Sequence, residues 1–388
     1  MWFVISLLCI IFANCAEKEY NVNNKNYKQY LLLIGVVNVV FLGLRDIGVG
    51  RDTLAYINPY FQYASTLTNV DSFFHTPYDI VGSFDKGFLF LAYLSSLVGN
   101  DSRILLFITE LFIMTFIVMG MYELKKTLNY SISFFYTFFV LLYLLETINL
   151  MRQFCAMSLL FYGYSLFLQK KWKAYLLCQI AAYFFHSTSV IFVVIPLGLV
   201  VSQMEKNYLL KKLYVLGVIF VGLFFVFSYN YFISIVENFG IFKESYFESY
   251  GANNQFSKAE GIGTTNLVSF IICITIYFIC KKNQFFPNEI LYIYIVLVLL
   301  NFIFQLASLI IIYYFRIAYY FGLILSVYLS LMLKKHNFTL KMSGYVYIVV
   351  FALYFMKVLY VSYYTKVDNQ YNRYNLIYKS QVLGIDES

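Results

Sequence analysis

Apolar stretches long enough to cross a bilayer constrain this chain more than any other feature of its sequence, and they recur along almost its whole length. A helix that spans a membrane needs about 20 mostly apolar residues. Of the 388 residues, 61% are hydrophobic and 12% are charged, whereas soluble domains are about 45–50% apolar and about 25% charged. A water-soluble core cannot bury such an excess, so the sequence predicts an integral membrane protein.

The apolar stretches predict helices rather than a barrel. They lack the alternation of apolar and polar residues that marks membrane β-strands, and the chain holds only 4 Pro. We therefore predict an all-α polytopic integral membrane protein with about 11–12 transmembrane or re-entrant helices, forming a single domain over 1–388. The predicted helical segments are 2–16, 29–44, 87–99, 103–122, 131–149, 151–169, 172–202, 213–229, 265–280, 289–312, 314–333 and 343–361.

Lysines in the short connections predict the orientation, because cytoplasmic loops are enriched in Lys and Arg. Five basic clusters are expected inside: Lys125 and Lys126; Lys170, Lys171 and Lys173; Lys206, Lys211 and Lys212; Lys281 and Lys282; and Lys334, Lys335 and Lys341. This arrangement places the first outer loop (45–86), the second outer loop (230–264) and the C-terminal tail (362–388) outside.

Two apolar segments do not fit a simple crossing. The segment 172–202 has a basic cluster on each side, so we predict a hairpin of two half-length helices with its tip at Phe185-His186-Ser187. The segment 87–99 is shorter than a bilayer requires, and we expect that it does not cross.

Arginine is distributed differently from lysine. With this orientation Lys18, Lys25 and Lys28 also lie inside, so that the inside loops hold 16 of the 22 Lys and none of the 6 Arg. The planar guanidinium suits phosphate and carboxylate better than an ammonium group does. The outer face is therefore predicted to bind anions. The net charge of +8 comes mainly from Lys and gives no indication of a nucleic-acid partner. The arginines are Arg45, Arg51, Arg103, Arg152, Arg316 and Arg373.

Two candidate catalytic residues lie in or beside apolar helices. Arg152 and Gln153 follow Glu146 and Asn149 closely, which favours a polar cavity over an arginine that merely reaches the membrane surface. His186 lies in a long apolar run beside a Ser-Thr-Ser sequence. An imidazole titrates near neutral pH, so it can accept a proton or donate to a phosphate, although a buried structural histidine remains an alternative.

The third candidate is Arg316, with Tyr319 and Tyr320 close to it along a helix. Tyrosine rings and hydroxyls around a cation can stack on a sugar and bond its hydroxyls, although an aromatic belt at the membrane interface is an equally ordinary interpretation.

The first outer loop contains glycines at 48 and 50, followed by Arg51 and Asp52. Asp52 or Thr53 is predicted to cap a helix that carries Tyr56, Tyr60 and Tyr63. A glycine-rich turn, a helix N-terminus and arginines together form a plausible phosphate site.

Metal and cofactor signatures are absent from the sequence. No HExxH motif and no CxxC pair occur, and the six Cys accompany apolar segments. We predict no metal and no cofactor, with a divalent ion at Asp46 and Asp52 as the minor alternative.

The ordered motifs resemble the EpsG family of bacterial polysaccharide polymerases, which is related in role to Wzy-type polymerases of O-antigen and capsule. The resemblance covers roughly 30–330. The matching motifs are Gly50-Arg51-Asp52-Thr53 with Tyr56, Asp85-Lys86-Gly87-Phe88, Arg152-Gln153-Phe154-Cys155-Ala156, Phe185-His186-Ser187, Gly261-Ile262-Gly263, and Phe315-Arg316 with Tyr319-Tyr320-Phe321. The residue Thr53, before the aromatic stretch, departs from the more usual pattern and leaves the role of Asp52 open.

The resemblance implies metal-independent, inverting glycosyl transfer at the outer face of the inner membrane. A glycan on undecaprenyl pyrophosphate would be transferred to the terminal sugar of another lipid-linked repeat unit. The expected partners are this lipid-linked oligosaccharide, the bilayer and a chain-length regulator protein. Among the outer-face groups His186 is the expected base, because Asp46 and Asp52 adjoin arginines that weaken them as bases.

Two other functions remain open at this point. One is a glycosyltransferase that uses polyprenyl-phosphate sugars, with an acidic base in the first outer loop. The other is a flippase for lipid-linked oligosaccharide, for which intramembrane charges spread along a pathway would be expected.

Overall fold

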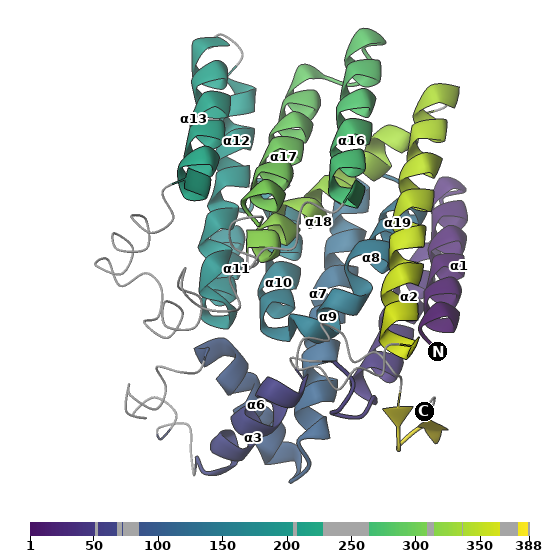
Figure 1. Ribbon diagram of the computed structural model, residues 1–388, viewed down its shortest axis with the longest axis vertical. Helices are drawn as coiled ribbons and strands as arrows, with labels where there is room; N and C mark the ends of the chain where they lie inside the picture. Colours follow the sequence, from purple (N-terminus) through teal and green to yellow (C-terminus); the bar gives the residue numbers. More distant parts are fainter. Residues whose placement is uncertain are drawn as a thin grey trace. The chain divides into compact units, whose positions relative to one another are not determined.

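The computed structural model describes residues 1–50, 53–67, 72, 85–204, 208–227, 264–308, 314–335, 337–364 and 379–386. The chain folds into two compact units, Met1–His186 with Phe351–Ser388, and Ser187–Val350. Almost all the described residues are helical (Figure 1), and β1 (Lys379–Ser380) and β2 (Ile385–Asp386) form a short antiparallel pair.

The first unit contains most of the N-terminal helices. They are α1 (Trp2–Asn21), α2 (Tyr27–Gly43), the π-helical turn η1 (Thr53–Ile57), α3 (Asn58–Ser65), α6 (Lys86–Val98), α7 (Arg103–Leu128), α8 (Ile132–Leu142), α9 (Leu144–Asn149), α10 (Met151–Leu168) and α11 (Trp172–Phe185). The second unit contains the 3₁₀ helix η2 (Ser187–Val193), α12 (Val194–Gln203), α13 (Tyr208–Phe227), α16 (Thr264–Lys282), α17 (Asn288–Ala307) and α18 (Tyr314–Leu333). The helix α19 (Phe338–Tyr364) belongs partly to each unit.

Within the described residues, five helices are long and apolar enough to cross a membrane: α7, α16, α17, α18 and α19. Shorter apolar helices, among them α2, α6 and α8, accompany them. The predicted fold class, an all-α polytopic membrane protein, is therefore confirmed.

The predicted break in the segment 172–202 is confirmed. The helix α11 ends at Phe185, and His186 is extended, with φ −159° and ψ 115°. The chain then continues as η2 and α12. The return of the second half toward the side from which the first half came stays a prediction. The predicted segment 131–149 is likewise divided, because α8 ends at Leu142 and α9 begins at Leu144.

In the first unit α2 and α7 run antiparallel. A Cβ at Gly43, the last residue of α2, would lie 3.1 Å from the Cα of Phe107 near the start of α7. At the opposite end, the rings of Tyr27 and Tyr122 stack with centroids 5.9 Å apart. The helix α10 packs against both α7 and α11. These contacts give the first unit two distinct ends.

One of these ends carries lysines, and we call it the Lys end of the first unit. Lys28 and Lys126 lie over the ring of Tyr122, with Nζ 5.2 and 3.6 Å from its centroid. Lys125 pairs with Glu17 at 3.0 Å. The other end carries Arg45, Arg103 and Arg152, and we call it the Arg end.

The helix α6 stays at the Arg end, as predicted for the segment 87–99. Two residues that flank α6, Asp85 and Ser102, both form hydrogen bonds to residues of α3. The Asp85 N–H donates to Tyr60 Oη at 2.8 Å, and the Ser102 hydroxyl donates to Asn58 Oδ1 at 2.7 Å. Since α2 arrives at this end and α7 leaves from it, α3 and α6 form a cap of two short helices between them.

The C-terminal strands lie at the same end as the start of the first outer loop. The Asp46 N–H donates to the Lys379 carbonyl at 2.8 Å, and the Gln381 N–H donates to Asp46 Oδ1 at 3.1 Å. The Ser380 hydroxyl donates to the Leu44 carbonyl. Residues 379–381 of the tail therefore contact the start of the first outer loop, while the side of the membrane on which both lie stays a prediction.

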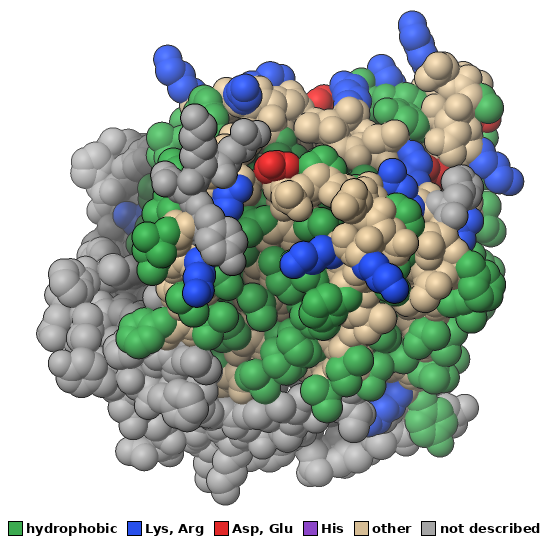
Figure 2. Space-filling view, turned by 90° about the horizontal axis from the view of Figure 1, so that it is seen from above, with side chains coloured by type: hydrophobic (Ala, Val, Ile, Leu, Met, Phe, Trp, Pro, Cys, Tyr) green, Lys and Arg blue, Asp and Glu red, His purple; other side chains and the backbone are tan. Residues whose placement is uncertain are grey.

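The second unit separates Lys from Arg in the same way. Lys335 lies over the ring of Phe286 at 5.1 Å, so the end of α18 lies beside the start of α17. The Tyr292 hydroxyl donates to the Lys211 carbonyl at 3.0 Å. Arg316 lies at the opposite end of α18. Figure 2 shows the face at the top of Figure 1, where more Lys and Arg than Asp and Glu side chains are visible. Of the second outer loop (230–264), only Thr264 belongs to the described residues.

Candidate functional site

Arg152 lies where two helices meet at the Arg end of the first unit. Leu150, with φ −129° and ψ 42°, separates α9 from α10, and Arg152 is the second residue of α10. Its side chain is 14% exposed. A cation this deeply placed in an apolar bundle requires partners, and the structure supplies a carboxylate and two tyrosines.

The carboxylate is that of Asp85, just before α6. Arg152 Nη1 lies 2.5 Å from Asp85 Oδ2, and the Asp85 side chain is only 7% exposed. The same Nη1 donates to Tyr60 Oη at 3.2 Å. The backbone N–H of Asp85 also donates to Tyr60 Oη, so the phenol oxygen forms a hydrogen bond with both residues of the ion pair. Charge-assisted bonds of this kind are among the stronger polar contacts in proteins.

Tyr56 completes the cluster from the side. The guanidinium carbon of Arg152 lies 3.7 Å from the centroid of the Tyr56 ring and 5.9 Å from that of Tyr60. Both distances lie within the range of cation–π contacts. The planar cation is thus held at its edge by Asp85 and Tyr60 and on its face by Tyr56. We call Tyr56, Tyr60, Asp85 and Arg152 the Arg152 cluster.

Local structure explains how these residues meet. Tyr56 and Tyr60 are four residues apart in the helical run formed by η1 and α3, so they lie on one side of it, with ring centroids 6.2 Å apart. Asp85 is extended, with φ −75° and ψ 118°, at the N-cap position of α6. Burial raises the pKa of Tyr60 to about 12, and the negative charge of Asp85 adds to this, while Arg152 opposes it.

His186 lies in the same unit, directly after a residue that packs beside the cluster. A Cβ at Gly87, two residues after Asp85, would lie 3.0 Å from the Phe185 ring and from the Phe184 carbonyl carbon. Only glycine therefore lets α6 approach the end of α11 so closely. His186 is 6% exposed, and its N–H donates to the Ala182 carbonyl at 2.9 Å.

Three neighbours of Arg152 along the chain are buried, and two of them form bonds within their own helices. The Asn149 amide donates to the Leu145 carbonyl at 3.0 Å, and the Gln153 amide lies 3.7 Å from the Met157 sulfur. Glu146 is 7% exposed. The hydrogen-bond and ion-pair partners described for Arg152 come from α3 and from Asp85, directly before α6.

Arg51 and Asp52 lie outside the described residues, so the predicted phosphate site is described only on either side of them. Gly50 has φ +95°, a conformation that favours glycine. Thr53 donates its hydroxyl to the Val49 carbonyl at 3.0 Å, whereas the N-cap of α3 is Ile57, with no side-chain bond. Thr53 therefore closes the turn instead of capping the helix.

In the second unit, the first turns of α18 carry Arg316, Tyr319 and Tyr320. Arg316 and Tyr319 are half-buried, and Tyr320 is 1% exposed. The Tyr320 hydroxyl lies 3.4 Å from that of Thr188 in η2. The ring of Tyr319 meets that of Phe315 edge-on at 5.5 Å. The two tyrosines therefore have different surroundings, and only Tyr319 keeps an exposed part.

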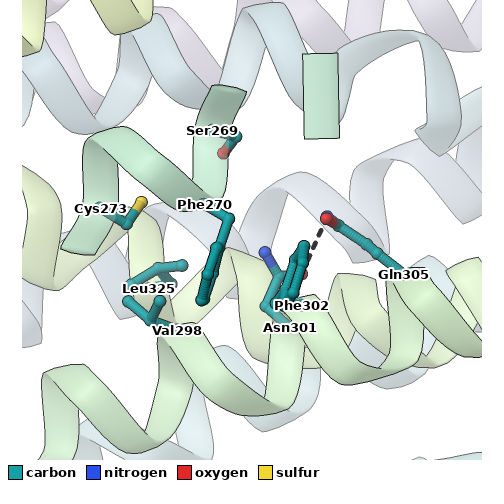
Figure 3. Close-up of a pocket in the computed structure, with 8 residues that line it drawn as sticks. All are labelled: Ser269, Phe270, Cys273, Val298, Asn301, Phe302, Gln305 and Leu325. Atoms are coloured by element: carbon teal, nitrogen blue, oxygen red, sulfur yellow. Dashed lines mark hydrogen bonds between the residues drawn. The ribbon is translucent and has the colours of Figure 1, made fainter. Parts of the chain in front are cut away.

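A small pocket lined by apolar and polar side chains also lies in the second unit, between α16, α17 and α18 (Figure 3). The Gln305 amide donates to Asn301 Oδ1 at 3.3 Å, and the rings of Phe270 and Phe302 stack beside them at 3.8 Å. The cavity volume is about 10 Å³, room for about one water molecule. Its size suits a hydrated contact between helices better than a sugar.

No group of three or more His, Cys, Asp or Glu side chains with metal-binding geometry occurs in the described part of the chain. The free cysteines there are Cys9, Cys15, Cys155, Cys178, Cys273 and Cys280.

The sequence model of the EpsG family matches residues 4–376, which is nearly the whole chain. The chain belongs to the EpsG family. Membership indicates a polysaccharide polymerase-type membrane protein, and the resemblance inferred from the ordered motifs is thereby confirmed. Neither a curated protein nor a solved structure matches the chain.

Sequence reasoning missed two members of the Arg152 cluster in this EpsG protein. Tyr60 was expected only as a residue of the same helix as Tyr56, and Asp85 only as part of a family motif. A usable signal did exist, since Asp85 is an acidic residue directly before an apolar helix that carries a glycine in its first turn. Nothing in the sequence pairs Asp85 with Arg152, however, because 66 residues separate them.

Proposed function

We propose that this EpsG protein joins undecaprenyl-pyrophosphate-linked oligosaccharide repeat units into O-antigen, capsule or exopolysaccharide. Family membership over residues 4–376 carries the proposal. The reaction is an inverting glycosyl transfer at the outer face of the inner membrane. It needs no nucleotide, because the donor sugar is already activated by its pyrophosphate.

Arg152 and Arg316 are proposed to stabilise the pyrophosphate leaving group. Negative charge develops on this group as the glycosidic bond breaks, and cations already in position stabilise it without having to reorganise. The contacts of Asp85 and Tyr56 support this role for Arg152, because they orient the plane of the guanidinium before substrate arrives. For Arg316 the support is its place at the end of α18 opposite the lysines.

His186 is proposed to take the acceptor proton. The acceptor hydroxyl oxygen forms a bond to the anomeric carbon while the bond from that carbon to the pyrophosphate oxygen breaks. The proton of the hydroxyl passes to the imidazole, and the lipid pyrophosphate leaves with the bonding electrons. General-base catalysis of this kind contributes about 10²–10⁴-fold. Burial of His186 beside the end of α11 supports a site from which bulk water is excluded.

The remaining site residues are proposed to hold sugar and lipid phosphate. Tyr319 would contact sugar rings and hydroxyls, Arg51 and Asp52 the lipid phosphate, and Tyr56 the sugar nearest the leaving group. Tyr320 and Gln153, which are 1% and 2% exposed, would support these contacts from behind instead of touching the sugar. We propose that the bilayer holds the polyprenyl chain and that a chain-length regulator protein sets the final size.

Chemical analysis of surface glycan from a deletion strain tests the proposal. A strain that lacks a polymerase still displays single repeat units, whereas one that lacks a flippase displays none. Complementation should restore the ladder of lengths. A polyprenyl-phosphate-sugar glycosyltransferase is the other alternative, and it predicts that Asp46 or Asp52 is essential and His186 dispensable.

A further inference from the structure

A fully buried ion pair lies at the Arg end of the first unit, outside the Arg152 cluster. Arg45 Nη1 lies 2.8 Å from Glu110 Oε1, and both side chains are 0% exposed. Among the described residues, Glu110 Oε2 has no hydrogen-bond partner. A buried pair contributes little net stability, because desolvation offsets the attraction, and apolar side chains of similar volume commonly do as well. Its presence therefore calls for a role other than stability.

The other contacts of Arg45 suggest such a role. Its Nη1 also donates to the Leu42 carbonyl in the last turn of α2, and its Nε donates to the Val49 carbonyl at 3.3 Å. Its Nη2 lies 3.7 Å from the Met151 sulfur at the start of α10. One guanidinium thus connects the end of α2, the turn that follows it and the start of α10, while Glu110 holds it from α7.

Two further contacts hold the residues that follow α2. The carbonyl of Val49 receives both Arg45 Nε and the Thr53 hydroxyl, at 3.3 and 3.0 Å. A Cβ at Gly50 would lie 3.0 Å from the Ile148 carbonyl oxygen of α9. The turn therefore rests directly on the helix that precedes Arg152.

Both residues of the Tyr56–Arg152 stack lie close along the chain to a residue that is connected to Arg45, either directly or through the Val49 carbonyl. Tyr56 lies three residues after Thr53, and Met151 directly precedes Arg152. We propose that Arg45 and Glu110 are positioning residues that set the Tyr56–Arg152 stack by holding Val49 and Gly50 against the end of α9 and the start of α10. This inference rests on the proposed function only in its effect on turnover, because the placement of the turn can be measured separately.

The test compares two buried ion pairs in the full-length protein, purified in lipid nanodiscs. The first variant is Arg45→Met/Glu110→Met. The matched control is Lys125→Met/Glu17→Met, which removes the pair of 3.0 Å at the Lys end of the same unit. Thermal unfolding, hydrogen exchange of peptides that cover 44–57, and kcat and KM with lipid-linked repeats are measured for each.

Because a misplacement of about 1 Å can cost about 10²-fold in rate, kcat of the first variant should fall about 10²-fold, with a smaller change in KM. Exchange in 44–57 should rise at least about tenfold, since the turn loses the bond from Arg45 Nε to the Val49 carbonyl and its link to the start of α10. The control should alter neither quantity. Wild-type exchange and kcat in Arg45→Met/Glu110→Met would show that the pair serves the fold alone and would overturn the inference.

If that double variant does not fold, Arg45→Lys decides. It keeps a positive charge opposite Glu110 but lacks the fork that also reaches Val49. Faster exchange in 44–57 supports the positioning role, and wild-type exchange contradicts it. If the wild-type protein itself makes no polymer, the proposed function fails, while the exchange comparison still decides whether Arg45 and Glu110 hold the turn.

Discussion

Replacing Arg152 by lysine tests the candidate site most directly. The charge survives in Arg152→Lys, so that Asp85 keeps a cationic partner. Nη1 of Arg152 makes both the bond to Asp85 and the bond to Tyr60, and the lysine side chain ends one bond short of that atom. Its ammonium also has no planar face to lie against the ring of Tyr56. The substitution therefore separates the presence of a cation from its orientation.

The size of the effect follows from the contacts. A hydrogen bond that involves a charged group is worth about 1.5–3 kcal/mol, which applies to the bond of 3.2 Å from Arg152 to Tyr60. Loss of the face contact with Tyr56 adds about 0.5–1 kcal/mol. If the transition state loses about 2–3 kcal/mol of the stabilisation that these two contacts provide, the rate falls about 30- to 150-fold.

The assay is the length distribution of glycan made by purified protein from lipid-linked repeat units. Arg103→Lys is the matched control, because Arg103 pairs with Asp101 at 2.6 Å, but in the open, with side chains 38% and 46% exposed. Hydrogen bonds from Arg103 lower the pKa of Asp101, and we expect this exposed pair to be dispensable. A wild-type ladder from Arg152→Lys would refute the role of the oriented guanidinium.

The remaining predictions concern neighbouring groups. Asp85→Asn leaves the buried cation without its carboxylate, so thermal unfolding should show a loss of up to about 3–5 kcal/mol, and no loss would remove Asp85 as the partner that holds Arg152. Activity should fall as pH drops from 8 to 5.5, because a protonated imidazole cannot accept a proton, and His186→Gln should flatten this profile; activity that rises toward acid would instead indicate a phosphate donor. Since burial raises the pKa of Tyr60 to about 12, its phenol stays protonated over this range, and Tyr60→Phe should leave the shape of the profile unchanged. Polymerisation should persist in excess EDTA, whereas loss of activity with recovery in Mg²⁺ would favour the glycosyltransferase alternative. Gly50→Ala forces a side chain into φ +95° and should cost about 1–3 kcal/mol, measurable as a lower unfolding midpoint.

Hydropathy and charge determined the helices and the two ends of each unit. Lys28 and Lys126 meet at Tyr122, and Lys335 lies by Phe286, as the lysine pattern predicted. The break at His186 was equally visible, because a mostly apolar run of 31 residues, 172–202, is too long for one ordinary span. The positions of the helices and of the lysines depend on residue type and on the bilayer as solvent. Both can therefore be predicted from short stretches of the sequence.

The partners within the site were decided only by the tertiary structure. Asp85 reaches Arg152 because Gly87 lets α6 approach α11 and because η1 and α3 bring two tyrosines against Arg152 of α10. Arg45 reaches Glu110 because α2 and α7 run antiparallel at close distance. Many acidic residues were available to each arginine in the sequence. The choice among these acidic residues depends on which helices pack together and on which of their residues lie at the same level. This is determined by side-chain packing between segments that are distant in the sequence, and such packing produces no periodic pattern in it.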